Sequence, residues 1–385
     1  MTSLRGGEHL MPSDHVHMTE MTGTKKRQPD LDIIRIIACF LVVFHHTRAY
    51  QAFGHTESMA GVWFYSLFSI VTRANVPLFF MLSGALLLRD KRKTYGEIFR
   101  KKMLKILLIL PVLTTMLTAI GAFRGYISGF SLETCVRFSL NGANLVGGVQ
   151  YWYLYAYLGI LVTLPFFQRM AKGMTRQDFL MLFFLHFFCV SFLTMLNTFA
   201  KEKGIEAIGL HSSFVNGAYL SVGQQFFYPL MGYYLCHRVD PLKLSRRLRC
   251  AVFASGCGGV LLSAFFKVRE MKSGGIRFSE DYLSLFDYLT AICLFLLIRV
   301  ICAEHGQFAS HKRFLSAVAR IAPLTYGMYL FEPFTKWTIY SRLVAWISAD
   351  TYQLYPNLIY CLLSMTLTGL LTWGLRRIPV VKRLF

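Results

Sequence analysis

The sequence of 385 residues combines a formal net charge of +21 with only 16% charged residues. Apolar types make up 55% of it, including 34 Phe and 20 Tyr. A soluble domain of this size has too little interior to bury so much apolar surface, and disordered chains need low hydrophobicity. A nucleic-acid-binding protein spreads its basic residues over a polar surface, whereas here they cluster between long apolar segments. We therefore predict an all-α integral membrane protein with no nucleic-acid partner.

Ten apolar segments are long enough to cross a bilayer, which takes about 20 mostly apolar residues. They lie at 33–53, 62–88, 104–123, 151–168, 178–198, 218–236, 250–267, 283–303, 321–346 and 356–375. The second is too long for one straight helix, and we expect Pro77 and the Ser83-Gly84 pair to kink it. Residues 1–28 are polar and are predicted to form a disordered tail. Residues 29–376 then form one membrane domain, and 377–385 form a short basic tail.

The distribution of basic residues supports this layout. If the N-terminus is cytoplasmic, 28 of the 41 Lys and Arg residues lie in cytoplasmic segments and 11 lie on the opposite side. Such an excess is what the positive-inside rule requires. The sequence therefore predicts a bundle of about ten transmembrane helices with both termini in the cytoplasm.

The nine cysteines include Cys39, Cys189, Cys257, Cys293 and Cys361, each within an apolar segment. The sequence contains no Cys-x-x-Cys motif and no Cys/His cluster with metal-ligand spacing. We interpret these cysteines as small buried apolar residues and predict no metal site.

Two arginines, Arg35 and Arg73, lie inside the predicted spans, where an ionisable residue is costly and therefore indicates function. Arg35 and His46 are eleven positions apart, so they share one helix face about 16 Å apart. Asp32 lies three positions before Arg35 and can pair with it. The alternative stays open that Arg35 reaches the lipid headgroups and His46 only hydrogen-bonds a neighbouring helix.

The second span contains Arg73, Asn75 and Pro77, followed by Ser83 and Gly84. An arginine followed by a proline and a pair of small residues indicates a broken helix beside a polar cavity. Small residues also let two helices pack closely. Close packing explains Ser83 and Gly84, but it does not explain Arg73.

Four motifs in order resemble those of the acyltransferase-3 family of bacterial integral-membrane O-acyltransferases. They are Arg35 with His46, the segment from Arg73 to Gly84, Tyr151 to Leu154 with Leu164-Pro165, and Thr325 to Glu332. The resemblance runs from about 29 to 376. Three positions depart from the family pattern: Asn75 stands where many members have a second arginine, and Tyr151 and Glu332 each replace a histidine.

The resemblance implies transfer of an acetyl group from cytoplasmic acetyl-CoA to a hydroxyl of a surface polysaccharide or lipid-linked glycan. It implies a multi-pass protein of the bacterial inner membrane with no permanently bound cofactor, and it leaves a homo-oligomer open. His46 would act as general base or as acyl carrier, with Arg35 and Asp32 beside it. The residues expected to bind acyl-CoA are Arg73, Asn75, Trp152 and Tyr329, and those expected to form a further polar site are Ser83 and Glu332.

Two interpretations of the basic segment 89–105 stay open, because its charges either attract the phosphates of CoA or only set the topology. Two other functions also stay open. A transporter or permease fits ten spans with scattered charges, and it would move a substrate without consuming acetyl-CoA. A membrane sensor derived from the family fits the three departures, and it would show no acetyl-CoA turnover. Nothing in the sequence names the acceptor sugar.

Overall fold

The computed structural model describes residues 27–47, 56, 58–89, 94–125, 127, 129–140, 151–193, 195–196, 200, 203, 223–272, 285–304, 312–347, 353–379 and 381–384. Within these ranges the chain is helical and has no strand, which confirms the predicted all-α class. Almost all of the predicted tail 1–28 lies outside the described residues.

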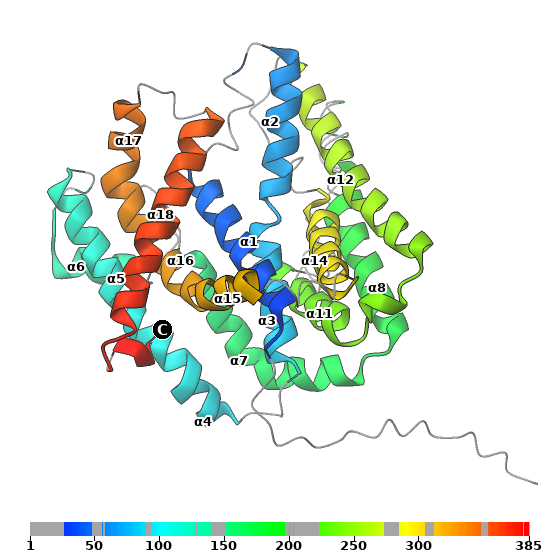
Figure 1. Cartoon of the computed structure of the whole chain (residues 1–385), viewed down its shortest axis with the longest axis horizontal. Helices are drawn as coiled ribbons and strands as arrows, with labels where there is room; N and C mark the ends of the chain where they lie inside the picture. Colours follow the sequence, from blue (N-terminus) through cyan, green and yellow to red (C-terminus); the bar gives the residue numbers. More distant parts are fainter. Residues whose placement is uncertain are drawn as a thin grey trace, which may run out of the picture.

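The α-helices form a bundle (Figure 1). They are α1 (Pro29–His46), α2 (Met59–Thr72), α3 (Asn75–Leu87), α4 (Tyr95–Ile98), α5 (Leu104–Phe123), α6 (Leu132–Leu140), α7 (Trp152–Gly173), α8 (Arg176–His186), α11 (Gln224–His237), α12 (Arg246–Lys272), α14 (Asp287–Glu304), α15 (Lys312–Ile321), α16 (Thr325–Thr335), α17 (Ser341–Trp346) and α18 (Leu354–Leu375). Short π-helical segments are η2 (Phe99–Met103), η3 (Phe187–Phe192) and η7 (Lys336–Tyr340), and 3₁₀ turns are η4 (Pro241–Lys243), η6 (Ala322–Leu324) and η8 (Val381–Arg383).

Within the described residues, six helical segments are long and apolar enough to cross a membrane, so the chain is a multi-pass membrane protein. They are Met59–Leu87, Tyr95–Phe123, Trp152–Gly173, Arg246–Arg269, Lys312–Trp346 and Leu354–Leu375. Helix α11 has only 14 residues, and α1 and α14 carry several charges each. The ten-span layout and the cytoplasmic termini therefore stay predictions.

Helix α1 lies in the middle of the bundle, where it packs against α3, α14, α15, α16 and α18 (Figure 1). Its first turn holds Pro29, Asp30 and Asp32. Proline has a backbone angle that fits the first helical position, and acidic side chains interact favourably with the positive end of the helix dipole. Ile34 and Phe44 are fully buried along its length. This central position brings the polar side chains of α1 into contact with several other helices.

The second predicted span is broken just before Pro77, one of the two places where a kink is expected. Helix α2 ends at Thr72 and α3 begins at Asn75, so the break lies at Arg73 and Ala74. Pro77 sits in the first turn of α3, where its missing N–H group costs nothing. Helix α3 then continues through Ser83 and Gly84. The prediction of a break after the arginine is confirmed, and the prediction of a kink at Ser83-Gly84 is wrong.

Gly84 instead lets two helices meet. A Cβ atom at Gly84 would lie 1.8 Å from the carbonyl oxygen of Pro229 on α11, and one at Gly232 would lie 2.0 Å from that of Met81 on α3. The two glycines thus form a reciprocal close contact between α3 and α11. The alternative that a small residue here serves helix packing is confirmed for Gly84.

The ninth predicted span, 321–346, corresponds to the candidate span Lys312–Trp346, which consists of several helical segments. Helix α15 lies across the bundle, whereas α17 and α18 run along it (Figure 1). After α15, the chain turns through η6, which contains Pro323, and continues as α16. Proline restricts the preceding residue and removes a backbone donor, which explains why the helix changes direction here.

The described cysteines are all free. Cys39, Cys189, Cys293 and Cys361 are buried, as predicted, but Cys257 is exposed. Cys257 lies on α12, which forms an edge of the bundle (Figure 1). One side of an apolar helix in this position faces lipid, so an apolar segment does not by itself bury each of its residues.

Candidate active site

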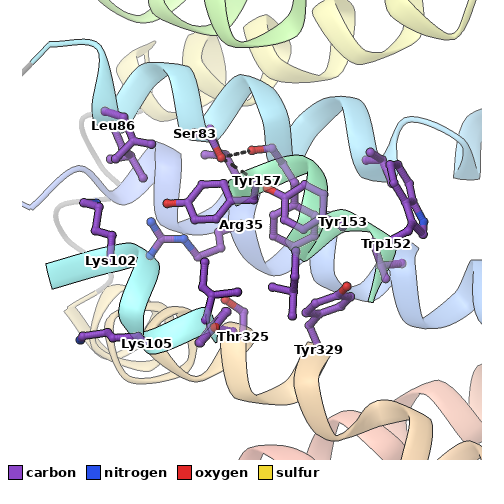
Figure 2. A pocket seen from close by; sticks show the side chains of 18 of the residues that line it. Arg35, Ser83, Leu86, Lys102, Lys105, Trp152, Tyr153, Tyr157, Thr325 and Tyr329 are labelled. Atoms are coloured by element: carbon purple, nitrogen blue, oxygen red, sulfur yellow. Dashed lines mark hydrogen bonds between the residues drawn. The ribbon is translucent and has the colours of Figure 1, made fainter. Parts of the chain in front are cut away.

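A pocket of about 590 Å³ opens between α1, α3, α7, α16 and the segment formed by η2 and α5. Its lining includes Arg35 and His46 from α1 and Leu384 from the C-terminal turn. Figure 2 shows Lys102 and Lys105 at one end of the pocket and Trp152 at the other. The prediction that Arg35 and His46 share a face is confirmed, because both contribute to the same wall.

His46 is paired with a buried carboxylate from a distant part of the chain. Its Nδ1 atom lies 2.8 Å from Oε2 of Glu332, which is 0% exposed. The Tyr360 hydroxyl donates to the other carboxylate oxygen, Oε1, at 3.0 Å. A buried carboxylate needs such partners, since burying an unpaired charge is very costly.

This pairing determines which nitrogen of His46 remains for chemistry. With Glu332 as a carboxylate, which only accepts hydrogen bonds, the tautomer of His46 that fits this contact carries its proton on Nδ1. The other nitrogen, Nε2, then keeps a lone pair that can accept a proton or attack a carbonyl. The arrangement of histidine and buried carboxylate is the one used to orient a general base.

Arg35 is held by Asp32, one turn earlier on the same helix. The Arg35 Nη1 atom donates to Asp32 Oδ1 at 3.5 Å, and Arg27 Nε donates to Oδ2 of the same carboxylate at 2.5 Å. The predicted Asp32–Arg35 pair is therefore confirmed. The Arg35 side chain is 28% exposed and lines the pocket, whereas Asp32 does not line it. Asp32 thus acts on the pocket through Arg35.

Lys101, Lys102 and Lys105 add three cations to the wall. They lie on the π-helical segment η2 and the first turn of α5. The helix that precedes them begins with a capping box between Thr94 and Glu97, which fixes its start. The sequence analysis placed these lysines only within a basic segment, because their direction depends on how α5 packs.

Aromatic side chains from two helices form an aromatic wall of the pocket: Trp152, Tyr153 and Tyr157 on α7, and Tyr326 and Tyr329 on α16. The rings of Tyr153 and Tyr329 meet edge to face, with centroids 6.1 Å apart. Ser83 lies 3.3 Å from the Tyr153 hydroxyl (Figure 2). Trp152, Tyr329 and Ser83 were expected near the site. Tyr153, Tyr157 and Tyr326 were missed, although their spacings of four and three from another tyrosine place each pair on one helix face.

Arg73 and Asn75 do not belong to the described lining of this pocket. Arg73 lies in the link between α2 and α3, where its charge acts on His45 and on Asp287 of α14. Asn75 is buried, and its side-chain oxygen accepts from the backbone N–H of Val76 at 2.5 Å. Their contact with acyl-CoA stays a prediction.

A family model described as an acyltransferase domain matches residues 28–377, which include every helix from α1 to α18. The chain belongs to the acyltransferase-3 family. Neither the comparison with curated proteins nor that with solved structures gives a match. This acyltransferase-3 protein is therefore a membrane acyltransferase, and the pocket around His46 is its candidate active site.

Proposed function

We propose that this acyltransferase-3 protein transfers an acetyl group from cytoplasmic acetyl-CoA to a hydroxyl of a surface polysaccharide or lipid-linked glycan. The observation that carries the proposal is the buried Glu332 carboxylate 2.8 Å from His46 in a pocket lined with cations. The choice of acetyl-CoA and of a glycan follows the resemblance stated above.

The charges of the pocket suit a CoA thioester. CoA is polyanionic, and Arg35, Lys101, Lys102 and Lys105 supply four cations to the pocket lining. Arginine and lysine bind phosphate through charge-assisted hydrogen bonds, and a cleft lined by one sign of charge raises the local concentration of the opposite sign. The aromatic wall formed by α7 and α16 then lies beside the apolar part of the donor.

The chemistry assigned to His46 is general-base catalysis. Nε2 of His46 accepts the proton of the acceptor hydroxyl while the hydroxyl oxygen attacks the thioester carbonyl. The C–S bond then breaks, the CoA thiolate leaves, and it takes the proton back from the imidazolium. The Glu332 carboxylate stabilises the imidazolium while it exists. In a second route, Nε2 attacks the thioester carbonyl first, the C–S bond breaks, and the CoA thiolate leaves while His46 holds the acetyl group. The acceptor hydroxyl then attacks this acetyl group, the N–C bond breaks to return neutral His46, and the hydroxyl proton goes to the CoA thiolate.

Isotope-labelled acetyl-CoA supplied to the reconstituted protein with extracted glycan tests the assignment. Replacing His46 with Gln should lower acetyl incorporation about 10²- to 10⁴-fold, the usual contribution of a general base. The matched control is His45→Gln, because His45 does not line the pocket and should leave incorporation within a few fold of the parent. Elution of each variant as a single monodisperse species shows that it has folded. Normal incorporation by His46→Gln would overturn the role of His46.

The acceptor is tested separately, by measuring O-acetyl groups on surface glycans from cells with and without the gene. Loss of O-acetyl groups in cells without the gene supports the proposal. Equal O-acetyl content, together with uptake or export of a solute by the reconstituted protein in the absence of acetyl-CoA, would favour the transporter.

A further inference from the structure

A second cavity, of about 530 Å³, lies on the other side of α16 from the aromatic wall. It runs between α5, α16 and α18, and the C-terminal turn closes one end. Its lining residues are Ile109, Val112, Leu113, Met116, Phe331, Phe334, Thr335, Leu367, Thr368, Leu371, Leu375, Val381 and Leu384. We call this cavity the rear groove.

The lining side chains of the rear groove have no hydrogen-bond donor left for a ligand. Its two hydroxyl groups are already used within the protein, since Thr335 donates to the Glu332 carbonyl at 2.8 Å and Thr368 to the Ser364 carbonyl at 2.6 Å. Every other lining side chain is apolar. The groove lies between three helices that belong to candidate membrane spans, and its rim residues Val112 and Leu371 are exposed. Hydrocarbon is the filling that such a surface favours at membrane depth.

Basic residues lie in the chain segment at one end of the rear groove, outside its apolar lining. Leu375, Val381 and Leu384 line this end, and the segment that joins them carries Arg376, Arg377 and Lys382 in addition to Arg383. Arg376 is fixed by a hydrogen bond to the Pro323 carbonyl at 3.2 Å. The Arg377 guanidinium lies over the Trp373 ring, 3.6 Å from its centroid, and the side chains of Arg377 and Lys382 are both exposed. Basic groups beside an intramembrane groove are the arrangement that attracts an anionic lipid headgroup.

We propose that the rear groove binds an acyl chain of an anionic phospholipid of the bilayer, with the phosphate at Arg377 and Lys382. The cavity is large enough for a ligand of drug size or more, and leaving it empty would forfeit packing contacts along three helices. The occupant is a bilayer lipid, because the basic residues at one end suit a phosphate and no polar group along the groove recognises a sugar.

The site would act on the active-site pocket through two shared elements. Phe331 and Thr335 lie in the groove wall on the same helix as Glu332, and Leu384 lines both cavities. A bound acyl chain therefore supports α16 and the C-terminal turn from behind. We expect the protein to bind acetyl-CoA more weakly when its anionic lipid is removed.

Native mass spectrometry of protein taken from bilayers of mixed phosphatidylglycerol and phosphatidylcholine tests the proposal. The parent protein should retain phosphatidylglycerol. Leu371→Trp fills the groove and should reduce the retained lipid at least about tenfold, the change that 1.4 kcal/mol of binding free energy produces. The matched control is Leu362→Trp, because Leu362 lies nine positions earlier, on the opposite face of α18, and is exposed. It should retain the lipid at the parent level.

A second pair of variants tests the basic residues without changing the packing of side chains in the groove. The double variant Arg377→Gln/Lys382→Gln should lose the preference for phosphatidylglycerol over phosphatidylcholine, whereas Arg246→Gln/Arg247→Gln, at exposed positions of α12, should keep it. Equal retention by Leu371→Trp and Leu362→Trp, or no preference in the parent, would overturn the proposal. Lipid retention is measured without acyl transfer, so a failure here is distinct from a failure of the proposed function.

Discussion

Glu332 is the residue that most changes the picture of this site. The resemblance places a histidine at this position, and the sequence alone leaves the role of the replacement open. In the structure the Glu332 carboxylate contacts His46 Nδ1 and the Tyr360 hydroxyl, and it is fully buried. It does not line the pocket. We therefore assign Glu332 as a positioning residue that acts through His46.

Replacing Glu332 with Gln tests this role. The variant keeps the size of the side chain but loses the charge, and a hydrogen bond to a charged group contributes about 1.5–3 kcal/mol. We expect kcat to fall about 10- to 100-fold while KM for acetyl-CoA stays within about twofold, because the pocket wall is unchanged. Tyr360→Phe should have a smaller effect in the same direction. An increase in KM with kcat unchanged would contradict the assignment.

Residue roles confined to one helix were predictable from the sequence, and those that depend on packing were not. Arg35, Asp32 and His46 share α1, so helical periodicity alone relates them. The partner of His46 is 286 positions away, and no local pattern brings the two together. The surroundings of Arg73 were equally unpredictable from the sequence, because its motif indicates a broken helix but not which neighbouring residues the arginine faces.

At the scale of helices, the reciprocal glycine contact between α3 and α11 holds one wall of the pocket. Val76, Phe79 and Ser83 on α3 line the pocket, and the opposite side of α3 meets α11 at Gly84 and Gly232. Backbone lies directly across from both glycines, so neither contact can relax by rotation of a side chain. The sequence indicated a small-residue contact but not its partner helix.

Gly84→Ala should therefore destabilise the protein, by about 1–3 kcal/mol, as expected for overpacking. Thermal unfolding in detergent should show a lower Tm. The control is Gly159→Ala, because a Cβ atom at Gly159 on α7 meets nothing within 4 Å and alanine favours a helix. A Tm of Gly84→Ala equal to that of the parent would show that the two helices separate without cost.

The segment formed by η2 and α5 is expected to govern donor binding. Replacing Lys101, Lys102 and Lys105 with Gln should raise KM for acetyl-CoA about tenfold, since three partly screened contacts of about 0.5 kcal/mol each sum to roughly one factor of ten. The dependence of KM on salt should also weaken. The same change at Lys243, Arg246 and Arg247, which are exposed and outside the pocket lining, should leave KM unchanged.

At the scale of the molecule, the number of membrane crossings decides where acceptor and donor meet. The composition and the basic loops predicted a polytopic helical protein well, because both depend on averages over many residues. They could not distinguish a central helix with charges, such as α1, from one that lies partly within the membrane. In the ten-span layout, His46 is in the outer half of the first span.

Truncations fused to alkaline phosphatase separate the ten-span layout from one with only the six candidate spans. A fusion after Ser58 should be active, and one after Lys243 inactive, if the first segment crosses and six spans precede Lys243. With the N-terminus in the cytoplasm and only the six candidate spans crossing, both results reverse. Fusions at the same two positions to a protein that fluoresces only in the cytoplasm give the complementary measurement, because they should fluoresce where the phosphatase fusion is inactive.

The distance along the chain between His46 and Glu332 has a consequence for biosynthesis. Helix α1 leaves the ribosome early, whereas α16 and α18, which supply Glu332 and Tyr360, are made near the end. During translation the imidazole is therefore present without its carboxylate partner. The nascent chain therefore lacks the pairing of His46 with Glu332 until its last helices have inserted, and we expect only the finished molecule to be active in acyl transfer.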